Sequence, residues 1–246
     1  MKKISIVMVC KNSAKTIEGS IKSFLSQTYK NKELIIVDGG SKDLTIDLIK
    51  RFKKKEILFF EKKNLGLYAS INYGIKKSTG TILGILHSDD KYCSTNVLDK
   101  VCKNFNTNKY DALYTDIFLV DRSKKIIRRW TNSKINNFSD SGLLPPHTGL
   151  YLKRNVFNSI GYYNEYYKIS SDIELMYKLF LNKNLKKKYL KLFSLNMLIG
   201  GLSTKSPLSV IKSNYEVYKI LKGLNIDYPM IMIFKKIKNK IKQLFV

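Results

Sequence analysis

The sequence predicts an α/β protein with a mostly parallel central sheet flanked by helices and a small helical appendage at the C-terminus. Short apolar runs alternate with amphipathic stretches over residues 4–86, which is typical of a sheet covered by helices on both faces. Polar residues stand where four of these apolar runs end. Residues 207–246 are rich in lysine and repeat their apolar residues at helical spacing.

The first half of the chain supplies four predicted strands with helices between them. The helical prediction after the first strand rests on Ile17, Ile21 and Phe24, which share one face at a period of 3.6 residues. The expected strands are Ile4–Cys10, Leu34–Val37, Ile57–Phe60 and Thr81–Leu86, and the expected helices are Thr16–Thr28, Asp43–Phe52 and Tyr68–Lys77.

The second half begins with a predicted hairpin and ends in helices. Its expected elements are strands over Ala112–Val120, Lys125–Trp130 and Gly149–Lys153, a short helix from Asn155, and helices over Ser171–Leu181, Tyr215–Leu221 and Pro229–Val246. Ser171 and Glu174 have the spacing of a capping box. We expect one domain over residues 1–206, with a nucleotide-binding half (1–110) and an acceptor half (111–206), followed by a basic amphipathic tail (207–246).

The charge is strongly positive, because 45 Lys and Arg residues face 19 Asp and Glu residues, giving +26. Such a charge favours polyanionic partners: nucleic acid, anionic lipid or phosphorylated substrates. Cys10, Cys93 and Cys102 have no metal-ligand spacing and leave one thiol unpaired, which fits a reducing, cytoplasmic compartment. No apolar run approaches the roughly 18 residues of a membrane span. We expect a soluble or peripheral protein.

Polar residues follow four of the predicted strands at the point where each strand ends. They are Asn12, Asp38, Asn64-Leu65-Gly66 and Ser88-Asp89-Asp90. The carboxyl ends of parallel strands meet at one edge of the sheet, where α/β proteins bind ligands. We therefore expect these residues to form one pocket.

The adjacent carboxylates of Asp89 and Asp90 predict a metal site, with a polar turn as the alternative. Two neighbouring anions repel each other unless a positive group lies close. A hard divalent cation meets that need, and it would also stabilise a diphosphate as a leaving group. No GxxxxGK[ST] or GxGxxG loop is present to bind phosphate instead. We expect Asp90 to be an exposed carboxylate at the strand end.

Two more carboxylates are candidates for binding and catalysis. Asp38 is placed to accept a hydrogen bond from a nucleobase, or it simply starts the turn before Gly39-Gly40. Asp172, near the start of a predicted helix, is the candidate general base for an acceptor hydroxyl. The alternative for Asp172 is a charge that stabilises the helix dipole, and Glu165 is the second candidate for the base.

Other polar residues lie late in the chain. His147 is a candidate for the acceptor or phosphate side, and the alternative is a histidine on a surface loop. Gly200-Gly201 forms either a flexible lid or a plain turn, with Ser203 and Thr204 able to bind phosphate.

Four segments, in this order, resemble the family-2 glycosyltransferases, which are inverting enzymes with the GT-A fold. The segments are SIVMVCKNSAKTI, SFLSQTYKNKELIIVDGGSKDLT, NLGLYASINYGIKKSTGTILGILHSDD and SSDIELMYKL. The likeness spans roughly Lys3 to Thr204. It is greatest to a branch used in bacterial surface-polysaccharide assembly, which shares the Pro146-His147 pair and a late Gly-Gly-x-Ser like Gly200-Gly201-Leu202-Ser203.

The resemblance implies a role for each matching residue. Asp90 ligates Mn²⁺ or Mg²⁺, and Asp172 is the general base. Asp89 faces the ribose and the diphosphate. The nucleotide-sugar site as a whole is assigned to Asn12, Asp38, Gly66, Asn72, Ser88 and Asp89. Relatives usually have Glu where this chain has Ser171, Asp and Lys at Ala69 and Tyr73, and Arg at Ile71, and these departures bear on donor contacts.

The expected reaction is an inverting, metal-dependent transfer of the hexosyl type from a nucleotide-diphosphate sugar. The resemblance and the charge imply a glycan acceptor, lipid-linked at the cytoplasmic membrane face, in cell-surface polysaccharide synthesis. A nucleotidyltransferase is the enzymatic alternative, but CKNSAKT lacks the glycine-rich loop that it would need after the first strand. A nucleic-acid-binding module is the other alternative. The lysines are spread along the chain rather than clustered with aromatic residues, so no nucleic-acid partner is expected.

The tail from Pro229 onward predicts a membrane-surface helix. Apolar residues recur at helical spacing and lysines flank them, with no acidic residue in the segment. This pattern suits the surface of an anionic membrane, and the alternative is an amphipathic helix packed on the domain. The apolar stripe is Ile231, Phe234, Ile237, Ile241 and Leu244, and the lysines are Lys235, Lys236, Lys238, Lys240 and Lys242.

Overall fold

The computed structural model describes residues 1–107, 109–132, 144–200 and 206–242, with side chains described up to Lys235. Within these residues nine strands form one sheet in the order β3-β2-β1-β4-β8-β6-β9-β5, and β7 pairs with β6. The strands are β1 (Ile4–Cys10), β2 (Lys32–Asp38), β3 (Ile57–Glu61), β4 (Ile82–Ile85), β5 (Lys91–Tyr92), β6 (Ala112–Val120), β7 (Ile126–Trp130), β8 (Leu150–Lys153) and β9 (Lys187–Leu198).

The predicted parallel arrangement of the first four strands is confirmed. Strands β1, β2, β3 and β4 pair only in parallel with one another. Beyond them the sheet is mixed: β8 is antiparallel to both β4 and β6, whereas β9 runs parallel to β6. The carboxyl ends of β1, β2 and β4 therefore lie at the same edge of the sheet.

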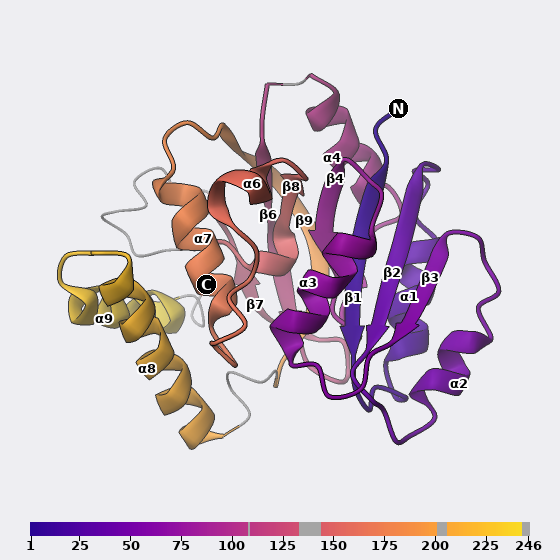
Figure 1. Ribbon diagram of the computed structural model, residues 1–246, viewed down its shortest axis with the longest axis horizontal. Helices are drawn as coiled ribbons and strands as arrows, with labels where there is room; N and C mark the ends of the chain where they lie inside the picture. The colour runs from indigo at the N-terminus through magenta and orange to yellow at the C-terminus, as the bar shows by residue number, and fades with distance from the viewer. Residues whose placement is uncertain (108, 133–143, 201–205, 243–246) are drawn as a thin grey trace.

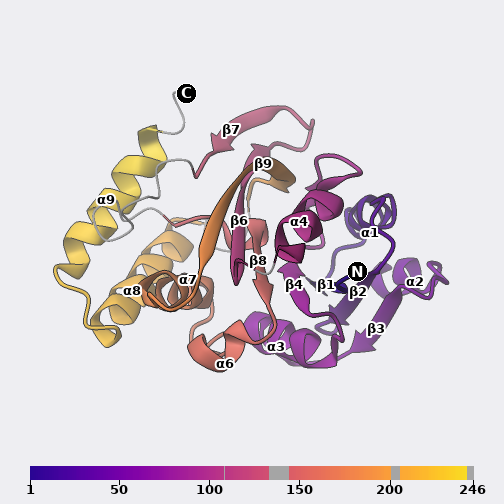
Figure 2. The same cartoon turned by 90° about the horizontal axis from the view of Figure 1, so that it is seen from above.

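Helices cover both faces of this sheet (Figures 1 and 2). Buried residues of α1, α2 and α4 form one core with one face, and buried residues of α3, α6 and α7 form a second core with the other. Strand residues that alternate between the two clusters, such as Ile6 and Val7 in β1, explain why the strand is apolar at nearly every position. These helices are α1 (Ile17–Leu25), α2 (Thr45–Lys50), α3 (Leu67–Lys77), α4 (Val97–Asn106), α6 (Val156–Ile160) and α7 (Ser171–Leu181).

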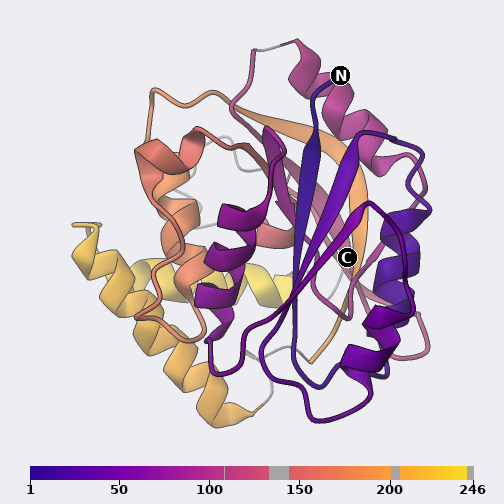
Figure 3. The ribbon, with the colours of Figure 1, turned by 45° about the vertical axis from the view of Figure 1, so that its right-hand side comes forward.

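The C-terminal appendage consists of α8 (Pro207–Gly223) and α9 (Pro229–Lys242), which lie beside α7 at the end of the molecule away from β3 (Figures 1 and 3). A third apolar cluster joins Tyr177 of α7 to Val217 and Leu221 of α8 and to Met232 of α9.

Helix α8 is longer than the predicted Tyr215–Leu221 segment. It begins after Ser206, whose side chain accepts the backbone N–H of Ser209, and has a proline in its first turn.

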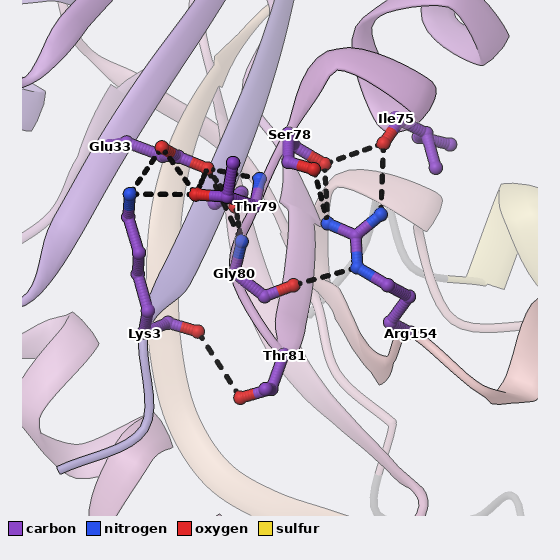
Figure 4. Close-up of polar contacts among 9 residues, drawn as sticks. Lys3, Glu33, Ile75, Ser78, Thr79, Gly80, Thr81 and Arg154 are labelled. Carbon is purple, nitrogen blue, oxygen red and sulfur yellow. Dashed lines mark hydrogen bonds and ion pairs between the residues drawn. The ribbon is translucent and has the colours of Figure 1, made fainter.

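A polar cluster at the amino edge of the sheet joins β1, β2 and the start of β4 (Figure 4). The Glu33 side chain, only 4% exposed, forms an ion pair with Lys3 at 2.6 Å. Its Oε1 atom also accepts the hydroxyl of Ser5 and the backbone N–H of Thr79, each at 2.6 Å. The carboxylate therefore joins its own strand, β2, to two other segments that are far apart in the sequence.

Arg154, which follows β8, completes this cluster from the other side (Figure 4). Its Nε donates to the carbonyl of Gly80 at 2.9 Å, and its Nη atoms donate to the carbonyls of Ser78 and Ile75 at 2.8 and 3.1 Å. The Ile75 carbonyl, in the last turn of α3, also accepts the N–H and the hydroxyl of Ser78, and the other two carbonyls belong to residues that follow the helix. Arg154 thereby fixes the passage from α3 into β4.

Glu33→Gln is expected to destabilise the fold in a pH-dependent way. Burial alone would raise the pKa of Glu33, but hydrogen bonds from Lys3, Ser5 and Thr79 lower it from 4.5 to about 2. Because the folded pKa lies below the unfolded value, this stability is present above about pH 4.5 and is lost as the pH falls toward 2. The substitution should cost roughly 1–3 kcal/mol of unfolding free energy near neutral pH and weaken the acid dependence, measured by thermal unfolding across pH.

Glu61→Gln is the matched control. Glu61 pairs with Lys50 at 3.1 Å, but the two side chains are 39% and 59% exposed. An exposed ion pair contributes about 0–1 kcal/mol, so this variant should unfold close to wild type at every pH. Equal losses in the two variants would contradict the anchoring role of Glu33.

Candidate active site

The carboxyl edge of the parallel strands brings several predicted residues together. Residues Cys10 and Asp38 are register partners at the ends of β1 and β2. The Ser13 hydroxyl, in the loop after β1, lies 2.9 Å from the hydroxyl of Ser88, after β4. The loop that contains Asn12 and the Ser88-Asp89-Asp90 triplet are therefore neighbours, as the sequence predicted.

Asp38 and Asn12 both build the turn that follows β2. The fully buried Asp38 carboxylate accepts the backbone N–H groups of Gly40 and Ser41 at 2.8 Å and the Ser41 hydroxyl at 2.5 Å. Asn12 has a left-handed backbone (φ +53°), and its side-chain oxygen accepts the N–H of Lys42 at 2.8 Å. The structure thus shows Asp38 in the role of a turn residue. A nucleobase contact by Asp38 and the assignment of Asn12 to the nucleotide pocket stay predictions.

Asp90 is buried, so the expectation of an exposed carboxylate was wrong. Its side chain is 1% exposed because the end of β9 covers it, and the N–H of Leu198 donates to Oδ1 at 3.2 Å. Its Oδ2 atom has no hydrogen-bond partner among the described residues. Burial and then the charge of half-buried Asp89 hold the pKa of Asp90 well above its usual range.

A divalent cation fits the unpartnered oxygen of Asp90. A nearby cation favours the ionised carboxylate and so offsets the cost of its burial. In the part of the chain that the structure describes, no three His, Cys, Asp or Glu side chains converge to hold a metal by themselves. Asp90 would therefore hold Mn²⁺ or Mg²⁺ together with ligands from outside the protein, such as water, which is typical of hard cations.

His147 contacts a second histidine, His87, instead of standing free on a surface loop. The two Nε2 atoms are 2.9 Å apart, and His147 lies in the short 3-10 helix η1 (His147–Gly149). Burial lowers the pKa of both rings below the ordinary value, so at neutral pH one ring donates and the other accepts. Sequence reasoning missed His87, although it directly precedes the Ser88-Asp89-Asp90 triplet.

Asp172 lies in the first turn of α7 and is held by Tyr68 of α3. The Tyr68 hydroxyl is 3.0 Å from Oδ1 of Asp172 and 2.6 Å from the carbonyl oxygen of Ile169, so its proton is shared between them.

The prediction of a capping box at the start of α7 was wrong, because the N-cap residue is Ser170 and it makes no side-chain capping bond. Ser171 is instead the first helical residue.

Asn72 and Glu165 meet at the loop before α7. The buried Asn72 amide donates to the carbonyl of Tyr163 at 2.8 Å and to Oε1 of exposed Glu165 at 2.9 Å, and it accepts the N–H of Tyr163 at 3.1 Å. Asn72 therefore fastens the 163–165 segment to α3. A contact between Asn72 and the donor stays a prediction.

A cavity of about 250 Å³ lies between the start of α3 and this loop. Gly66, the N-cap residue of α3, lines it with open space on the side where a Cβ would stand. Tyr68 also lines the cavity, so a ligand held there would lie next to the side chain that holds Asp172. The described residues that line it are Asn64, Leu65, Gly66, Leu67, Tyr68, Ala69, Glu165, Tyr167 and Lys168.

The last predicted phosphate contacts cannot be placed. Ser203 and Thr204 lie outside the described residues. Gly200, two residues after the end of β9, has φ +102°, a conformation that favours glycine. Because Leu198 donates to Asp90, the chain leaves β9 directly at the candidate metal site.

Residues 5–167 match the family model described as glycosyl transferase family 2. The chain belongs to this family. It is 31% identical over 188 residues to an uncharacterized glycosyltransferase of Rickettsia conorii, a match that covers 72% of this chain and 31% of that protein. It is 29% identical over 209 residues to a PGL/p-HBAD biosynthesis glycosyltransferase of Mycobacterium bovis, covering 81% of this chain and 78% of that protein. The chain thus spans less than a third of the Rickettsia relative.

Solved structures share the fold of this family-2 chain. The structure of S. aureus TarS residues 1–349 in complex with UDP-GlcNAc has a TM-score of 0.74 at 19% identity, covering 92% of this chain and 67% of that one. The mannosyltransferase PcManGT from Pyrobaculum calidifontis, in complex with GDP-Man and Mn²⁺, has a TM-score of 0.67 at 14% identity, covering 92% and 65%. The predicted GT-A fold is confirmed.

Asp90→Asn is expected to stabilise the metal-free protein and to remove its response to Mn²⁺. The folded pKa of Asp90 is raised, so the unfavourable ionised form develops as the pH rises above the unfolded value of 3.8. The variant does not titrate, and its gain in melting temperature over wild type should grow as the pH rises. Mn²⁺ should raise the wild-type melting temperature and leave the variant unchanged.

Asp47→Asn serves as the control, since Asp47 is an exposed carboxylate on α2, outside the Ser88-Asp89-Asp90 triplet. It should melt like wild type with and without Mn²⁺. An Asp90→Asn variant that still responds fully to Mn²⁺ would remove Asp90 from the metal site.

Proposed function

We propose that this chain is a metal-dependent inverting glycosyltransferase that moves a hexose from a nucleotide-diphosphate donor to a hydroxyl acceptor. The observation that carries this proposal is the buried Oδ2 of Asp90 at the carboxyl edge of the parallel strands, which has no hydrogen-bond partner in the described part of the chain. Membership of glycosyl transferase family 2 supports glycosyl over nucleotidyl transfer. The fold neighbours solved with UDP-GlcNAc, or with GDP-Man and Mn²⁺, support the donor class and the cation.

The donor would lie along the carboxyl edge of the sheet. Asn12, Asp38 and Ser88 would face the nucleotide, and Asp89 the ribose and diphosphate. When bound, Mn²⁺ or Mg²⁺ neutralises the diphosphate and makes it a better leaving group. The cavity beside Gly66 is placed to receive the sugar, with Asn72 supporting the loop that forms its far wall.

Asp172 would act as the general base. The acceptor oxygen attacks the anomeric carbon, its proton passes to the Asp172 carboxylate, and the bond from the anomeric carbon to the diphosphate oxygen breaks. Attack opposite the leaving group inverts the anomeric centre. Tyr68 holds Asp172 through its hydroxyl, so the base is oriented before the acceptor arrives.

We propose that residues 1–110 bind the nucleotide and residues 111–206 meet the acceptor, with His147 on that side. A lipid-linked glycan in cell-surface polysaccharide synthesis is the acceptor class that we favour. It is supported by the M. bovis relative, which is named for PGL/p-HBAD biosynthesis. Ser203 and Thr204 would bind phosphate beside the acceptor.

Asp172→Asn is expected to lower turnover by roughly 10² to 10⁴, the usual contribution of general acid–base catalysis, without weakening donor binding. The amide keeps the size of the carboxylate but cannot take the proton. Release of UDP from UDP-GlcNAc and of GDP from GDP-Man, with Mn²⁺ present, measures turnover, and calorimetry with the free nucleotide measures binding.

Glu165→Gln is the comparison, because Glu165 is the second candidate for the base and lines the cavity. This variant should keep most of the turnover. The reverse result, with Glu165→Gln inactive and Asp172→Asn active, would show that Glu165 is the base.

We also propose that α9 attaches the protein to the cytoplasmic face of an anionic membrane. In α9, Met232 and Ile233 are buried, whereas Ile231 and Phe234 are 50% and 66% exposed. The helix thus packs through one face and leaves another apolar face open, with five lysines in residues 235–242. Within the described residues no helix has the length and apolar character needed to cross a bilayer.

The double variant Ile231→Ser/Phe234→Ser tests this proposal without removing the buried residues of α9. Wild type should bind vesicles that contain an anionic lipid, more weakly as salt increases, and the variant should bind at least about tenfold more weakly, since each apolar side chain contributes about 1.5–3 kcal/mol on burial. Leu44→Ser, which changes an equally exposed residue before α2, should bind like wild type. Unchanged binding of the double variant, measured by co-sedimentation, would exclude this face as the membrane contact.

A further inference from the structure

Glu216, in the middle of α8, binds the loop that leads into α7. The side chain is 7% exposed. Its Oε1 accepts the backbone N–H of Lys168 at 3.0 Å, and its Oε2 accepts those of Ile169 and Ser170, both at 2.9 Å. One carboxylate from the C-terminal appendage thus gathers three consecutive amides of another segment.

These three amides directly precede the first turn of α7. The side chain of Ser170, the N-cap residue, does not cap its own helix. It bonds to Ser213 of α8, with the two hydroxyls 3.0 Å apart. A helix begins with N–H groups that have no partner within the helix, and a negative charge close to them is favourable. The backbone that leads into α7 is therefore anchored by α8, and the side chain of its N-cap residue bonds to α8 as well.

The anchored loop also reaches the proposed base. Ile169 is held from two sides, since its N–H donates to Glu216 and its carbonyl accepts the Tyr68 hydroxyl. The same hydroxyl contacts Asp172, three residues further along the chain. A shift of this loop would move the backbone that carries Asp172 and the Ile169 carbonyl that helps to orient the Tyr68 hydroxyl.

We propose that Glu216 is a positioning residue that sets the location of Asp172 from the C-terminal appendage. This inference rests on the proposed role of Asp172 as the base. It makes α8 a part of the catalytic architecture, although α8 supplies no group to the reacting atoms. A displacement of about 1 Å at a catalytic group lowers the rate by about 10²-fold. Even a small shift of the loop that Glu216 holds is therefore expected to lower turnover.

The chemistry requires a carboxylate at this position. Three N–H donors converge on two oxygens, and both oxygens are used. A glutamine has the same shape but keeps one acceptor oxygen, and its NH₂ group would face N–H donors. Glu216→Gln therefore breaks part of the anchor without creating a cavity.

The test compares Glu216→Gln with wild type in the full chain. Hydrogen exchange of the peptide that contains residues 168–170 should become at least about tenfold faster. Release of UDP from UDP-GlcNAc and of GDP from GDP-Man, with Mn²⁺, should slow by roughly 10- to 100-fold, with the affinity for the free nucleotide unchanged within about twofold. Lys212→Gln, an exposed charge one turn earlier on α8, should match wild type in all three measurements.

Each of the other outcomes would contradict a specific part of the inference. Unchanged exchange at residues 168–170 would mean that Glu216 does not hold the loop. Faster exchange with unchanged turnover would mean that the anchor is only structural. If Asp172→Asn itself leaves turnover intact, the assignment of the base fails, and the positioning role falls with it, whereas the exchange result still reports the anchor. Should Glu216→Gln not fold, Glu216→Asp provides the same readouts, with smaller changes in the same direction expected.

Discussion

The buried carboxylate of Glu33 fixes the amino ends of β1, β2 and β4 relative to one another. It binds Lys3 and Ser5 at the start of β1 and Thr79 ahead of β4, while Glu33 itself belongs to β2. Three strands are thus fixed at their amino ends. Their carboxyl ends then stop together, and the Ser13 and Ser88 hydroxyls meet at the opposite edge. The position of the candidate site depends on this remote anchor.

The buried carboxylate at the candidate metal site has fewer hydrogen-bond partners than the buried carboxylate at the amino edge of the sheet. Glu33 has a donor for each oxygen, whereas Asp90 has an oxygen without a partner among the described residues. A buried carboxylate in this state opposes folding, and it persists only because the surrounding sheet and Leu198 hold it. The contrast separates a carboxylate kept for stability from one kept for a ligand.

The sequence correctly predicted those strands and helices that have a clear local pattern of apolar residues. The apolar runs gave β1 and β6 with their observed bounds, and the helix over Ser171–Leu181 was also correct. Strand β9 was missed because its residues are mostly half-buried and lysine-rich, so neither alternation nor a continuous apolar run stands out. His87, Tyr68 and Glu216 were missed for another reason: each acts through a partner 46 to 104 residues away, and no sequence spacing encodes such a contact.

The structure also shows which departures from the family pattern are packing residues and which one lines the cavity. Ile71 is fully buried in the core formed with α3, so it is a packing residue. Tyr73 packs edge-on against Phe60 with ring centroids 5.5 Å apart, and Lys62 lies over its ring at 4.8 Å. Of the three departures at Ala69, Ile71 and Tyr73, Ala69 is the one that lines the cavity. Ile71 and Tyr73 therefore bear on how α3 packs on the sheet, and Ala69 would bear on sugar selectivity under the proposed binding of the donor sugar in this cavity.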